Sequence, residues 1–534
     1  MEKENINRLI RPLTEDYEEY LRDESRKTGF GESISFPASQ EEISQIMKYC
    51  FAHDITVTVQ GSRTGVGGGA VPLGGHVMSL ERMKGIQMAE GGEETREGRR
   101  YHEGPYEEER SVVVQSGVTL KEIEAFVRAK TGDQFFFPPD PTETTASAGG
   151  MIACNSSGAR TYCYGPVRNY VQRIKVVFAD GSALDIPRGF YFAKGRDFYL
   201  KTDEGSVFAG KLPFYLMPAV KNAAGYFVNS RMDLIDLFIG SEGTLGIIVE
   251  AQLRLIPKPK EIWGLVAFFE GEGKAGLGKG VGFSRILRDC PALRRKLLSI
   301  EYFDKGSLAL LRDRKEEDPA SLSAPCIEPS FQEAVFVEIR GESKEEILRS
   351  LEQVGSCIQE AGGRQEDTWV AMNDIDFQSF KQLRHATPEC VNRLISQKKQ
   401  QGLNITKLGS DMSVRDDRLE DVVRMYRRDL EKGGFRYVMF GHIGNNHLHV
   451  NIISQSEEEY ARGKALFGKW AGMVAAWNGS VSAEHGVGKL KKAYLITMYG
   501  AQYVGQMRGM KGIFDPKGLL GRDNLFDWKE ENDI

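Results

Sequence analysis

The sequence predicts an α+β protein, because its two parts carry different patterns. Up to about residue 260, short runs of β-branched and aromatic residues are separated by glycine-rich loops, which is typical of sheets with few helices. Beyond that point, predicted strands alternate with predicted helices, which indicates a sheet covered by a layer of helices. Residues 257–259, Pro-Lys-Pro, form a suitable boundary. With 534 residues the chain is long enough for about three to four domain-sized units.

Composition excludes several classes of protein. The net charge is −5 and no run of Lys and Arg is long enough to follow a phosphate backbone, so we expect no nucleic-acid partner. No run approaches the roughly 18 apolar residues that span a bilayer, and the polar start leads to no signal peptide. Seven cysteines form no CxxC pair and are expected as reduced thiols. These features predict a cytoplasmic protein and leave open a peripheral contact with a membrane.

Helical patterns dominate the start of the chain. Residues 1–30 are charged and carry apolar side chains at helix spacing, and residues 41–51 predict a second helix. Ser39 is the expected N-cap of the second helix, and Glu42 completes a capping box three residues on. Further along, Thr119 is expected to cap a helix that runs to about residue 130.

The strands of the first part are linked by turns and by one charged segment. Runs at 55–59 and 111–118 predict strands, and the highly charged residues 89–110 are expected to be a solvated insertion in a hairpin. A second hairpin is expected over residues 174–184, with Asp180-Gly181 as its turn.

Glycine is abundant in this chain, with 59 of 534 residues where a share of roughly 7% is usual. Three glycine-rich segments therefore indicate backbone that approaches a large ligand. Residues 60–69 follow a strand and offer free N–H groups of the kind that cradle phosphate oxygens. Ala70-Val-Pro ends this loop without a helix, so it is neither a P-loop nor a GxGxxG motif. Residues 137–158 have almost no side-chain bulk to pack a core, and residues 240–248 form another glycine-rich turn between strands.

The second part shows a regular alternation of elements. Strands are predicted at 263–269, 299–303, 334–340, 403–408, 437–442 and 448–453. Helices are predicted at 284–298, 344–361, 375–398, 416–432 and 456–477.

A histidine cluster is the strongest chemical signal in the sequence. Three of the eight histidines, His442, His447 and His449, fall within residues 440–449, and His485 follows in Ser-Ala-Glu-His-Gly at 482–486. Gly-Asn-Asn at 444–446 is turn chemistry between two strands, so a hairpin is expected. His447 and His449 are two residues apart on a strand and therefore share one face.

These residue types are suited to holding a metal. The three imidazoles are expected to converge at the mouth of the hairpin, and Glu484 is available as a carboxylate ligand. Imidazole with carboxylate suits Zn, Mn, Fe or Co, and an open coordination position makes such a site catalytic.

Taken in order, these segments resemble the FAD-linked oxidases of the vanillyl-alcohol-oxidase (PCMH) superfamily. The resemblance covers nearly the whole chain and is most specific at residues 240–246 and 482–486. Within the superfamily it points to the branch of D-lactate dehydrogenases, D-2-hydroxyglutarate dehydrogenases and the glycolate oxidase D subunit. It implies a two-lobed PCMH-type FAD-binding domain at 1–260, a cap of antiparallel sheet and helices at 261–490, and a helical tail at 491–534 that returns to the first domain.

The resemblance also implies a set of cofactor contacts. The expected FAD-binding residues are Gly61, Ser62, Arg63, Thr64, Gly65, Pro139, Thr145, Gly149, Asn155, Ser156, Gly158, Gly165, Glu242, Gly246 and Ile247. The first loop lacks the histidine that often carries covalent flavin in this superfamily, so we expect non-covalent FAD. Cys154 is expected to be a small buried residue instead of a thiol link.

Matched to the metal-dependent branch, His442, His449 and Glu484 are the expected ligands and His485 the general base. Arg384 and Lys407 match the family's clamps for a substrate carboxylate. The implied reaction is oxidation of a D-2-hydroxy acid to the 2-oxo acid, with a hydride passed to flavin N5 and a metal on the substrate oxygens.

The sequence departs from the family at two places. The usual Gly-His-x-Gly-Asp-Gly-Asn-x-His becomes Gly-His-Ile-Gly-Asn-Asn-His-Leu-His, so His447 replaces an Asn and is a further ligand or a second base. Near the end of the chain, residues 521–524 replace the usual Asn-Pro-Gly-Lys.

The sequence leaves the electron acceptor and two other functions open. The acceptor is expected to be oxygen, a quinone, an electron-transfer flavoprotein or a partner subunit, since no ferredoxin-type cysteine run is present. One alternative is a transferase like alkylglycerone-phosphate synthase, and another is a non-catalytic flavin subunit of a larger complex.

Overall fold

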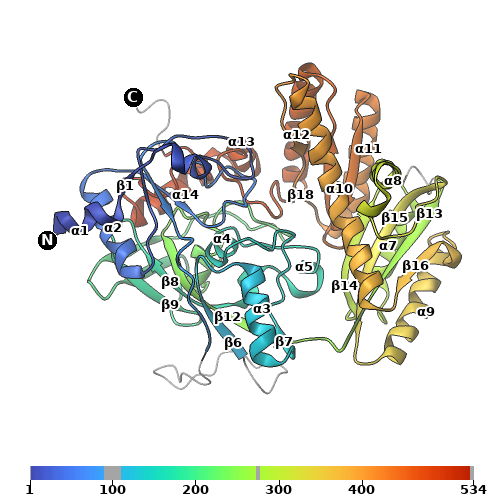
Figure 1. Ribbon diagram of the computed structural model, residues 1–534, viewed down its shortest axis with the longest axis horizontal. Coiled ribbons are helices and arrows are strands. Elements are labelled where there is room, and N and C mark those ends of the chain that lie inside the picture. The colour runs from blue at the N-terminus through green and yellow to red at the C-terminus, as the bar shows by residue number, and fades with distance from the viewer. Residues whose placement is uncertain (1, 90–109, 272, 274–276, 529–534) are drawn as a thin grey trace.

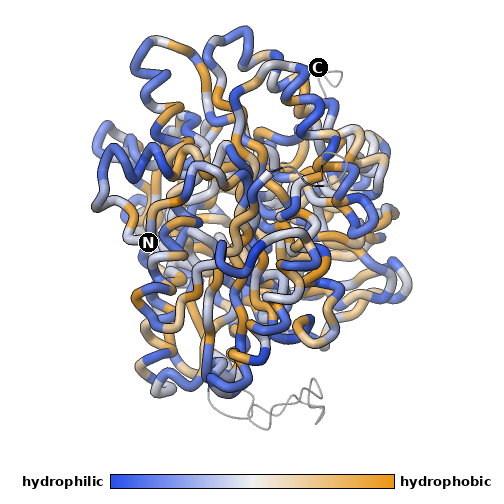
Figure 2. The backbone as a smooth tube through the Cα atoms, turned by 90° about the vertical axis from the view of Figure 1, so that its right-hand side faces the viewer, coloured by the Kyte–Doolittle hydropathy of each residue, from blue (hydrophilic) through white to orange (hydrophobic). Residues whose placement is uncertain are grey.

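The computed structural model describes residues 2–89, 110–271, 273 and 277–528. Figure 1 shows two bodies side by side, one formed by the N-terminal half together with the last two helices and the other by the segment in between. Both bodies combine sheets with helices, which confirms the α+β class. Figure 2 shows hydrophobic stretches running through the interior, with hydrophilic stretches prevailing in the outer loops.

The first body contains two main sheets and a small strand pair. A four-stranded sheet has the order β1 (Arg11–Pro12), β2 (Ser33–Ser35), β4 (His76–Ser79), β3 (Val57–Gln60). A larger sheet has the order β5 (Ile86–Met88), β6 (Arg110–Gln115), β12 (Ile247–Pro257), β8 (Val171–Val177), β9 (Ala183–Pro187), with β7 (Phe135–Phe136) also on β12. The separate pair is β10 (Asp197–Lys201) and β11 (Val207–Lys211). In the larger sheet every pairing is antiparallel, and the predicted hairpin at 174–184 is confirmed as β8 and β9.

Helices cover these sheets. They are α1 (Glu2–Leu9), α2 (Gln40–Ala52), α3 (Leu120–Thr131), α4 (Ala148–Ala153), α5 (Thr161–Tyr164) and α6 (Ile235–Phe238), with 3-10 turns at Glu15–Leu21 and Val167–Tyr170. Thr119 caps α3 as predicted, since its hydroxyl accepts the Glu122 N–H at 3.3 Å. Ser39 likewise caps α2, but the Glu42 carboxylate accepts the N–H of Ala38 at 2.7 Å, so the predicted capping box does not close on Ser39.

Two further predictions for the first body are wrong. The single helix expected over residues 1–30 ends at Leu9, because Pro12 lacks an N–H and its strand pairs with β2. Residues 137–158 do pack a core, since they contain α4, whose Met151 and Ile152 are buried. The charged insertion predicted at 89–110 lies almost wholly outside the described residues, although the strands that flank it, β5 and β6, pair with each other.

The second body is built on one antiparallel sheet of eight strands. Its order is β16 (Thr368–Ala371), β13 (Glu261–Glu270), β15 (Phe331–Gly341), β14 (Leu297–Phe303), β19 (Tyr437–Gly441), β20 (His447–Ile452), β17 (Leu408–Gly409), with β18 (Met412–Ser413) also on β20. Its helices are α7 (Lys279–Asp289), α8 (Lys305–Glu317), α9 (Lys344–Glu360), α10 (Asp374–Gln400), α11 (Leu419–Gly433) and α12 (Glu457–Ala476). The predicted sheet covered by helices is therefore confirmed.

Three details of this body differ from the prediction. The helix expected at 284–298 ends at Asp289, because Pro291 follows and the chain enters β14 at Leu297. Only the last residue of the strand expected at 403–408 belongs to a strand, β17. Helix α8 was not predicted.

The end of the chain packs on the first body. Helices α13 (Lys492–Tyr499) and α14 (Ala501–Phe514) lie beside the N-terminal elements in Figure 1. Phe514 stacks on Phe178 and Phe208, and Leu520 forms a parallel bridge with Val57 at the start of β3. The tail therefore lies next to the strand that carries the first glycine-rich loop.

Candidate functional site

Four segments that are far apart in the sequence converge in the first body. A Cβ atom on Gly61 would lie 2.0 Å from Ser147 Oγ, so the first glycine loop packs directly on the start of α4. The N–H of Gly240 donates to the Ile152 carbonyl at 3.0 Å, which joins the third glycine-rich segment to the second. The N–H of Lys489 donates to the Gly67 carbonyl at 2.9 Å and brings in the segment after His485. The predicted cofactor segments thus meet at one place.

The first loop presents a row of free donors. Within the described chain, no backbone N–H from residue 61 to residue 69 donates to another protein group. A Cβ on Gly65 would meet nothing within 4 Å, so this part of the loop faces open space. Unpaired N–H groups at a glycine loop are the donors that bind phosphate oxygens, so the loop fits a cofactor with a pyrophosphate.

Some predicted cofactor contacts have a structural role in the protein itself. A Cβ on Gly246 would lie 2.4 Å from Val176 Cγ1, so packing requires a glycine there, and the φ of 75° at Gly165 favours glycine at that position. The Asn155 amide oxygen accepts the N–H of Arg168 at 3.1 Å. The remaining predicted contacts lie on the same converging segments: Ser62, Arg63, Thr64, Pro139, Thr145, Gly149, Ser156, Gly158 and Ile247.

Glu242 links the third glycine turn to the segment that carries His485. Its half-buried carboxylate accepts the N–H groups of Val487 and Gly488, each at 2.7 Å. Burial raises the pKa of Glu242, and the two N–H donors oppose that rise. The residue has a φ of 54°, which places it in a sharp turn. This carboxylate therefore fixes the position of the Glu484-His485 pair relative to the cofactor loops.

The predicted hairpin forms and brings the histidines together. His442, His447, His449 and Glu484 each offer one ligand atom, and these atoms all lie within 4.8 Å of one another. His442 Nε2 lies 3.2 Å from Glu484 Oε1, and His449 Nε2 lies 3.6 Å from Glu484 Oε2. The cluster fits a divalent cation, because it combines imidazole and carboxylate donors in a buried place.

Acceptors behind two of the rings fix their orientation. His442 Nδ1 lies 2.8 Å from Glu301 Oε1, and His449 Nδ1 lies 3.0 Å from the Ser410 carbonyl oxygen. An acceptor at Nδ1 holds the proton on that nitrogen, so the Nε2 atoms are left to face Glu484.

His447 differs from the other two rings. Its Nε2 lies 3.1 Å from Asp411 Oδ1, but neither ring nitrogen makes a hydrogen bond of normal geometry, and the side chain is fully buried. A buried polar group without a partner is costly. A ligand at this nitrogen would remove that cost.

Burial and charge together favour the protonation state that binds a metal at three of the four groups, the exception being His442. Burial alone would raise the pKa of Glu484, but His442, Lys221 and His449 outweigh it and hold that pKa well below its usual range. Burial lowers the pKa values of His447 and His449, which favours neutral imidazole. Burial would also lower the pKa of His442, but Glu301 and Glu484 raise it. Metal ions bind neutral imidazole and ionised carboxylate.

His485 lies beside the cluster and faces a buried carboxylate. Its Nδ1 is 3.2 Å from Asp411 Oδ2, and 41% of the side chain is accessible. Lys491 Nζ contacts the same Asp411 oxygen at 2.6 Å. Burial would raise the pKa of Asp411, but Lys491, His485 and His447 hold it well below the usual value. An ionised Asp411 therefore orients His485 and leaves its Nε2 free to accept a proton.

Of the two residues predicted to clamp the substrate carboxylate, only Arg384 contacts a residue, Glu301, that in turn contacts the histidine cluster. Arg384 Nε lies 3.4 Å from Glu301 Oε2, directly behind His442. Lys407 has no hydrogen-bond or ion-pair partner within the described chain, and its side chain is accessible although protein surrounds it. These surroundings and the nearby Arg26 lower the pKa of Lys407 to about 8.

Three residues of the site were not predicted. Lys221 donates to the Glu484 carboxylate and to the Gly158 carbonyl. Glu301 contacts His442 Nδ1, and Asp411 contacts His485 Nδ1. Glu301 is the one that the sequence signalled, because it is a lone carboxylate within the apolar strand β14.

Comparisons with known proteins agree with this geometry. Residues 32–186 match the family model of the FAD binding domain, and residues 283–525 match that of the FAD linked oxidases, C-terminal domain. A D-2-hydroxyglutarate dehydrogenase of Stutzerimonas stutzeri (strain A1501) is 28% identical over 502 residues, which cover 92% of this chain and 90% of the relative. A D-lactate dehydrogenase of Anaerostipes hadrus is 28% identical and covers 90% and 86%, and the glycolate oxidase subunit GlcD of Bacillus subtilis (strain 168) is 26% identical and covers 93% and 89%.

Solved structures share the fold. A 4-ethylphenol oxidase of Gulosibacter chungangensis superposes with a TM-score of 0.63 at 15% identity, covering 98% of this chain and 95% of that one. An alkyldihydroxyacetonephosphate synthase gives a TM-score of 0.57 at 14% identity, covering 93% and 76%. No helix in the described ranges is both long enough and apolar enough to cross a membrane. The chain carries an FAD binding domain and the C-terminal domain of FAD linked oxidases in sequence order, and it is an FAD-dependent oxidoreductase.

Proposed function

We propose that the protein oxidises a D-2-hydroxy acid, such as D-lactate, glycolate or D-2-hydroxyglutarate, to the 2-oxo acid. The observation that carries this proposal is the buried group of His442, His447, His449 and Glu484 beside the His485–Asp411 pair. The names of the relatives, which are dehydrogenases of D-2-hydroxyglutarate and D-lactate, support it. FAD, held without a covalent bond by the glycine loops, would supply the hydride acceptor.

The histidines and Glu484 would hold a divalent Zn, Mn or Fe ion. Such an ion supplies a positive charge for the hydroxyl and carboxylate oxygens of the substrate. His447 is included as a ligand because neither of its buried ring nitrogens makes a hydrogen bond of normal geometry within the described chain. Glu301 and the Ser410 carbonyl would keep the ring tautomers that present Nε2.

His485 is the proposed general base. The substrate hydroxyl must lose its proton as the hydride leaves C2, and His485 is the accessible imidazole at the edge of the cluster. Asp411 holds His485 Nδ1, so Nε2 takes the proton and Asp411 stabilises the resulting charge.

Arg384 and Lys407 are the proposed clamps for the substrate carboxylate. Arg384 lies beside Glu301 with 13% of its side chain accessible, and Lys407 is an amine with no protein partner in the described chain. In this scheme residues 1–260 and the tail at 491–534 hold the cofactor, and residues 261–490 form the substrate face.

Anaerobic mixing with hydroxy acids tests the activity. FAD-loaded protein should lose its oxidised-flavin absorbance with a D-2-hydroxy acid or glycolate and keep it with L-lactate. Equal bleaching by the D and L forms of lactate would contradict the assignment. A transferase without net oxidation, which the shared fold with alkyldihydroxyacetonephosphate synthase leaves open, would give no lasting bleaching with any of them.

Two variants separate the proposed roles in the same assay. His485→Ala should keep its metal while flavin reduction slows on the order of 10²–10⁴-fold, because only the base is lost. His442→Ala should bind FAD but lose bound metal. A non-catalytic flavin subunit, the remaining alternative, would show no flavin reduction in the unmodified protein. The electron acceptor, a quinone, an electron-transfer flavoprotein or a partner subunit, is to be sought only after reduction is established.

A further inference from the structure

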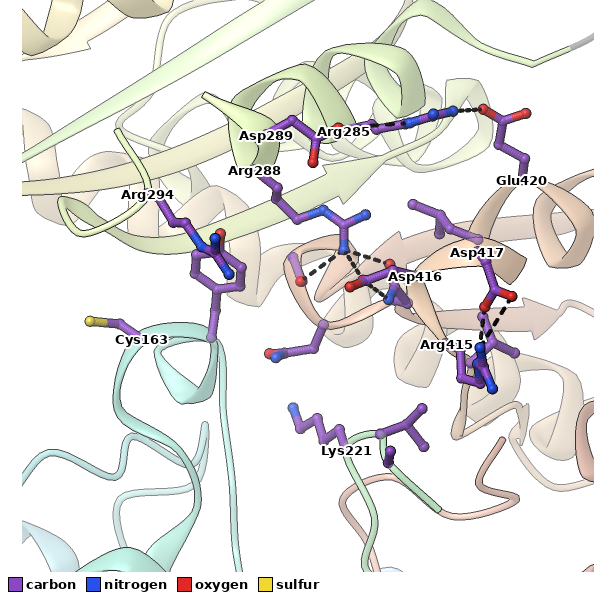
Figure 3. Close-up of a pocket in the computed structure, with 18 of the residues that line it drawn as sticks. Cys163, Lys221, Arg285, Arg288, Asp289, Arg294, Arg415, Asp416, Asp417 and Glu420 are labelled. Carbon is purple, nitrogen blue, oxygen red and sulfur yellow. Dashed lines mark hydrogen bonds and ion pairs between the residues drawn. The ribbon is translucent and has the colours of Figure 1, made fainter. Parts of the chain in front are cut away.

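A cavity of about 1450 Å³ lies where the two bodies meet (Figure 3). The first body contributes Tyr162 and Cys163 of α5 and the loop that ends in Lys221. The second body contributes α7, the segment after it, the start of α11 and the tip of the histidine hairpin. This volume exceeds the roughly 300–1,000 Å³ of common small-molecule pockets. None of the residues assigned above to FAD, metal or base lines it.

Among the charged side chains that line the cavity, more cations than anions lack an ion-pair partner within the described chain. Six arginines line it: Arg285, Arg288, Arg294, Arg295, Arg340 and Arg415. Each carboxylate in the lining has an arginine partner: Glu420 with Arg285 at 2.7 Å, Asp416 with Arg288 at 2.9 Å, Asp417 with Arg415 at 3.1 Å, Asp421 with Arg418 at 2.8 Å and Asp289 with Arg285 at 3.9 Å. The lining acids are therefore neutralised within the protein.

The surplus positive charge belongs to two lining arginines that are adjacent in the chain. The guanidinium groups of Arg294 and Arg295 are exposed and have no hydrogen-bond or ion-pair partner in the described ranges. Arg340 donates from Nε and Nη2 to the Arg295 carbonyl oxygen at 3.2 and 3.1 Å, which anchors this segment at the end of β15. Two neighbouring cationic side chains without a carboxylate repel one another, and an anion would relieve that repulsion.

We propose that this cavity, the arginine cleft, binds an organic anion with a phosphate or carboxylate group. Guanidinium groups bind phosphate and carboxylate through paired hydrogen bonds, so Arg294 and Arg295 would hold the anionic group. Lys221 lines the cleft and donates to Glu484, so the cleft extends to the histidine cluster.

This chemistry has two possible sources. The anionic group is either the distal end of the hydroxy acid that is oxidised or a separate anion. The first source rests on the proposed function, whereas the second does not.

Calorimetric titration of the FAD-loaded protein with inorganic phosphate, at constant ionic strength, tests the site without turnover. The Arg294→Gln/Arg295→Gln variant should bind phosphate at least about tenfold more weakly, because two charge-assisted contacts are lost. The matched control Lys344→Gln/Arg349→Gln removes the same charge from exposed positions of α9 and should bind like the unmodified protein. Absence of binding to the unmodified protein, or equal binding by both variants, would overturn the proposal.

Kinetics then identify the source. If the anion belongs to the substrate, Arg294→Gln/Arg295→Gln should raise KM for 3-phospho-D-glycerate and leave KM for D-lactate unchanged. If the anion is a separate ligand, phosphate should change the turnover of D-lactate, and the variant should abolish that change. Failure of every hydroxy acid to reduce the flavin would contradict the proposed function alone, since the calorimetric result would still decide whether the cleft binds anions.

Discussion

His442 Nδ1 lies 2.8 Å from Glu301 Oε1, and this contact leaves the other ring nitrogen, Nε2, facing Glu484 at 3.2 Å. Glu301 is almost fully buried on β14 and also lies 3.4 Å from Arg384 Nε. Burial would raise the pKa of Glu301, but His442 and Arg384 lower it, so it is ionised at neutral pH. An ionised carboxylate behind a histidine raises the basicity of the ligand nitrogen.

Replacement of this carboxylate should weaken metal binding without loss of FAD. Glu301→Gln keeps the shape but removes the charge, so we expect affinity for zinc or manganese to fall about 10–100-fold. A competition titration with a chelating dye measures the affinity, and the flavin absorbance reports the FAD content. Glu333→Gln is the matched control, because Glu333 is a buried carboxylate on β15 that contacts Tyr302 and Arg427 instead of a histidine. Equal affinity in the Glu301 variant and this control would contradict the role given to Glu301.

His447 is expected to be a metal ligand. His447→Asn restores the residue usual in the family at this position, and it should lower metal affinity at least about tenfold because a direct ligand is lost. The metal content of the dialysed protein, determined by elemental analysis, checks this outcome. His385→Asn, at a half-buried histidine on α10 outside the cluster, should retain the metal. Unchanged metal content with an altered rate or substrate preference would instead make His447 a base or substrate contact.

The histidine hairpin could be predicted because its signals are local. Strand residues flank a Gly-Asn-Asn turn, and the two-residue period places His447 and His449 on one face. The order of the glycine segments and their resemblance to a known family then predicted both bodies.

Residues whose role arises from contacts distant in the sequence were not predictable. Lys221 lies 263 residues from Glu484, to which it donates, and Asp411 lies 74 residues from His485, which it contacts. Neither residue belongs to a distinctive local sequence pattern. The same holds for packing: Gly246 is a glycine because of Val176 on a neighbouring strand. The cleft arginines carry no motif either, since their surplus charge appears only once the lining carboxylates are paired.

The FAD should be released intact by acid. The first loop offers N–H groups and no nucleophile, and burial, with Glu242, raises the pKa of the Cys154 thiol to about 12, so it is not a thiolate at neutral pH. Precipitation with trichloroacetic acid should leave the flavin spectrum in the supernatant. Yellow colour that remains with the washed, proteolysed pellet would contradict non-covalent binding.

The free energy of unfolding should decrease as the pH is lowered, because one buried histidine of the first body resists protonation in the folded state. His76 on β4 is fully buried between Ser33 Oγ at 2.9 Å and Ser35 Oγ at 2.7 Å, and burial lowers its pKa to about 4. In the unfolded chain a histidine has a pKa of about 6.5, so between these values the unfolded state binds a proton that the folded state does not. The free energy of unfolding is therefore unaffected above pH 6.5 and decreases as the pH falls towards 4.

Urea unfolding at pH 8 and pH 5 measures this contribution. His76 should account for about 2 kcal/mol of the stability lost between these values, so His76→Gln, though less stable overall, should lose about that much less than the unmodified protein. His53→Gln, at an exposed ring that meets water in both states, should leave the loss nearly unchanged. An equal loss of stability in the unmodified protein and in His76→Gln would show that the His76 ring takes up its proton as readily in the folded protein as in the unfolded chain.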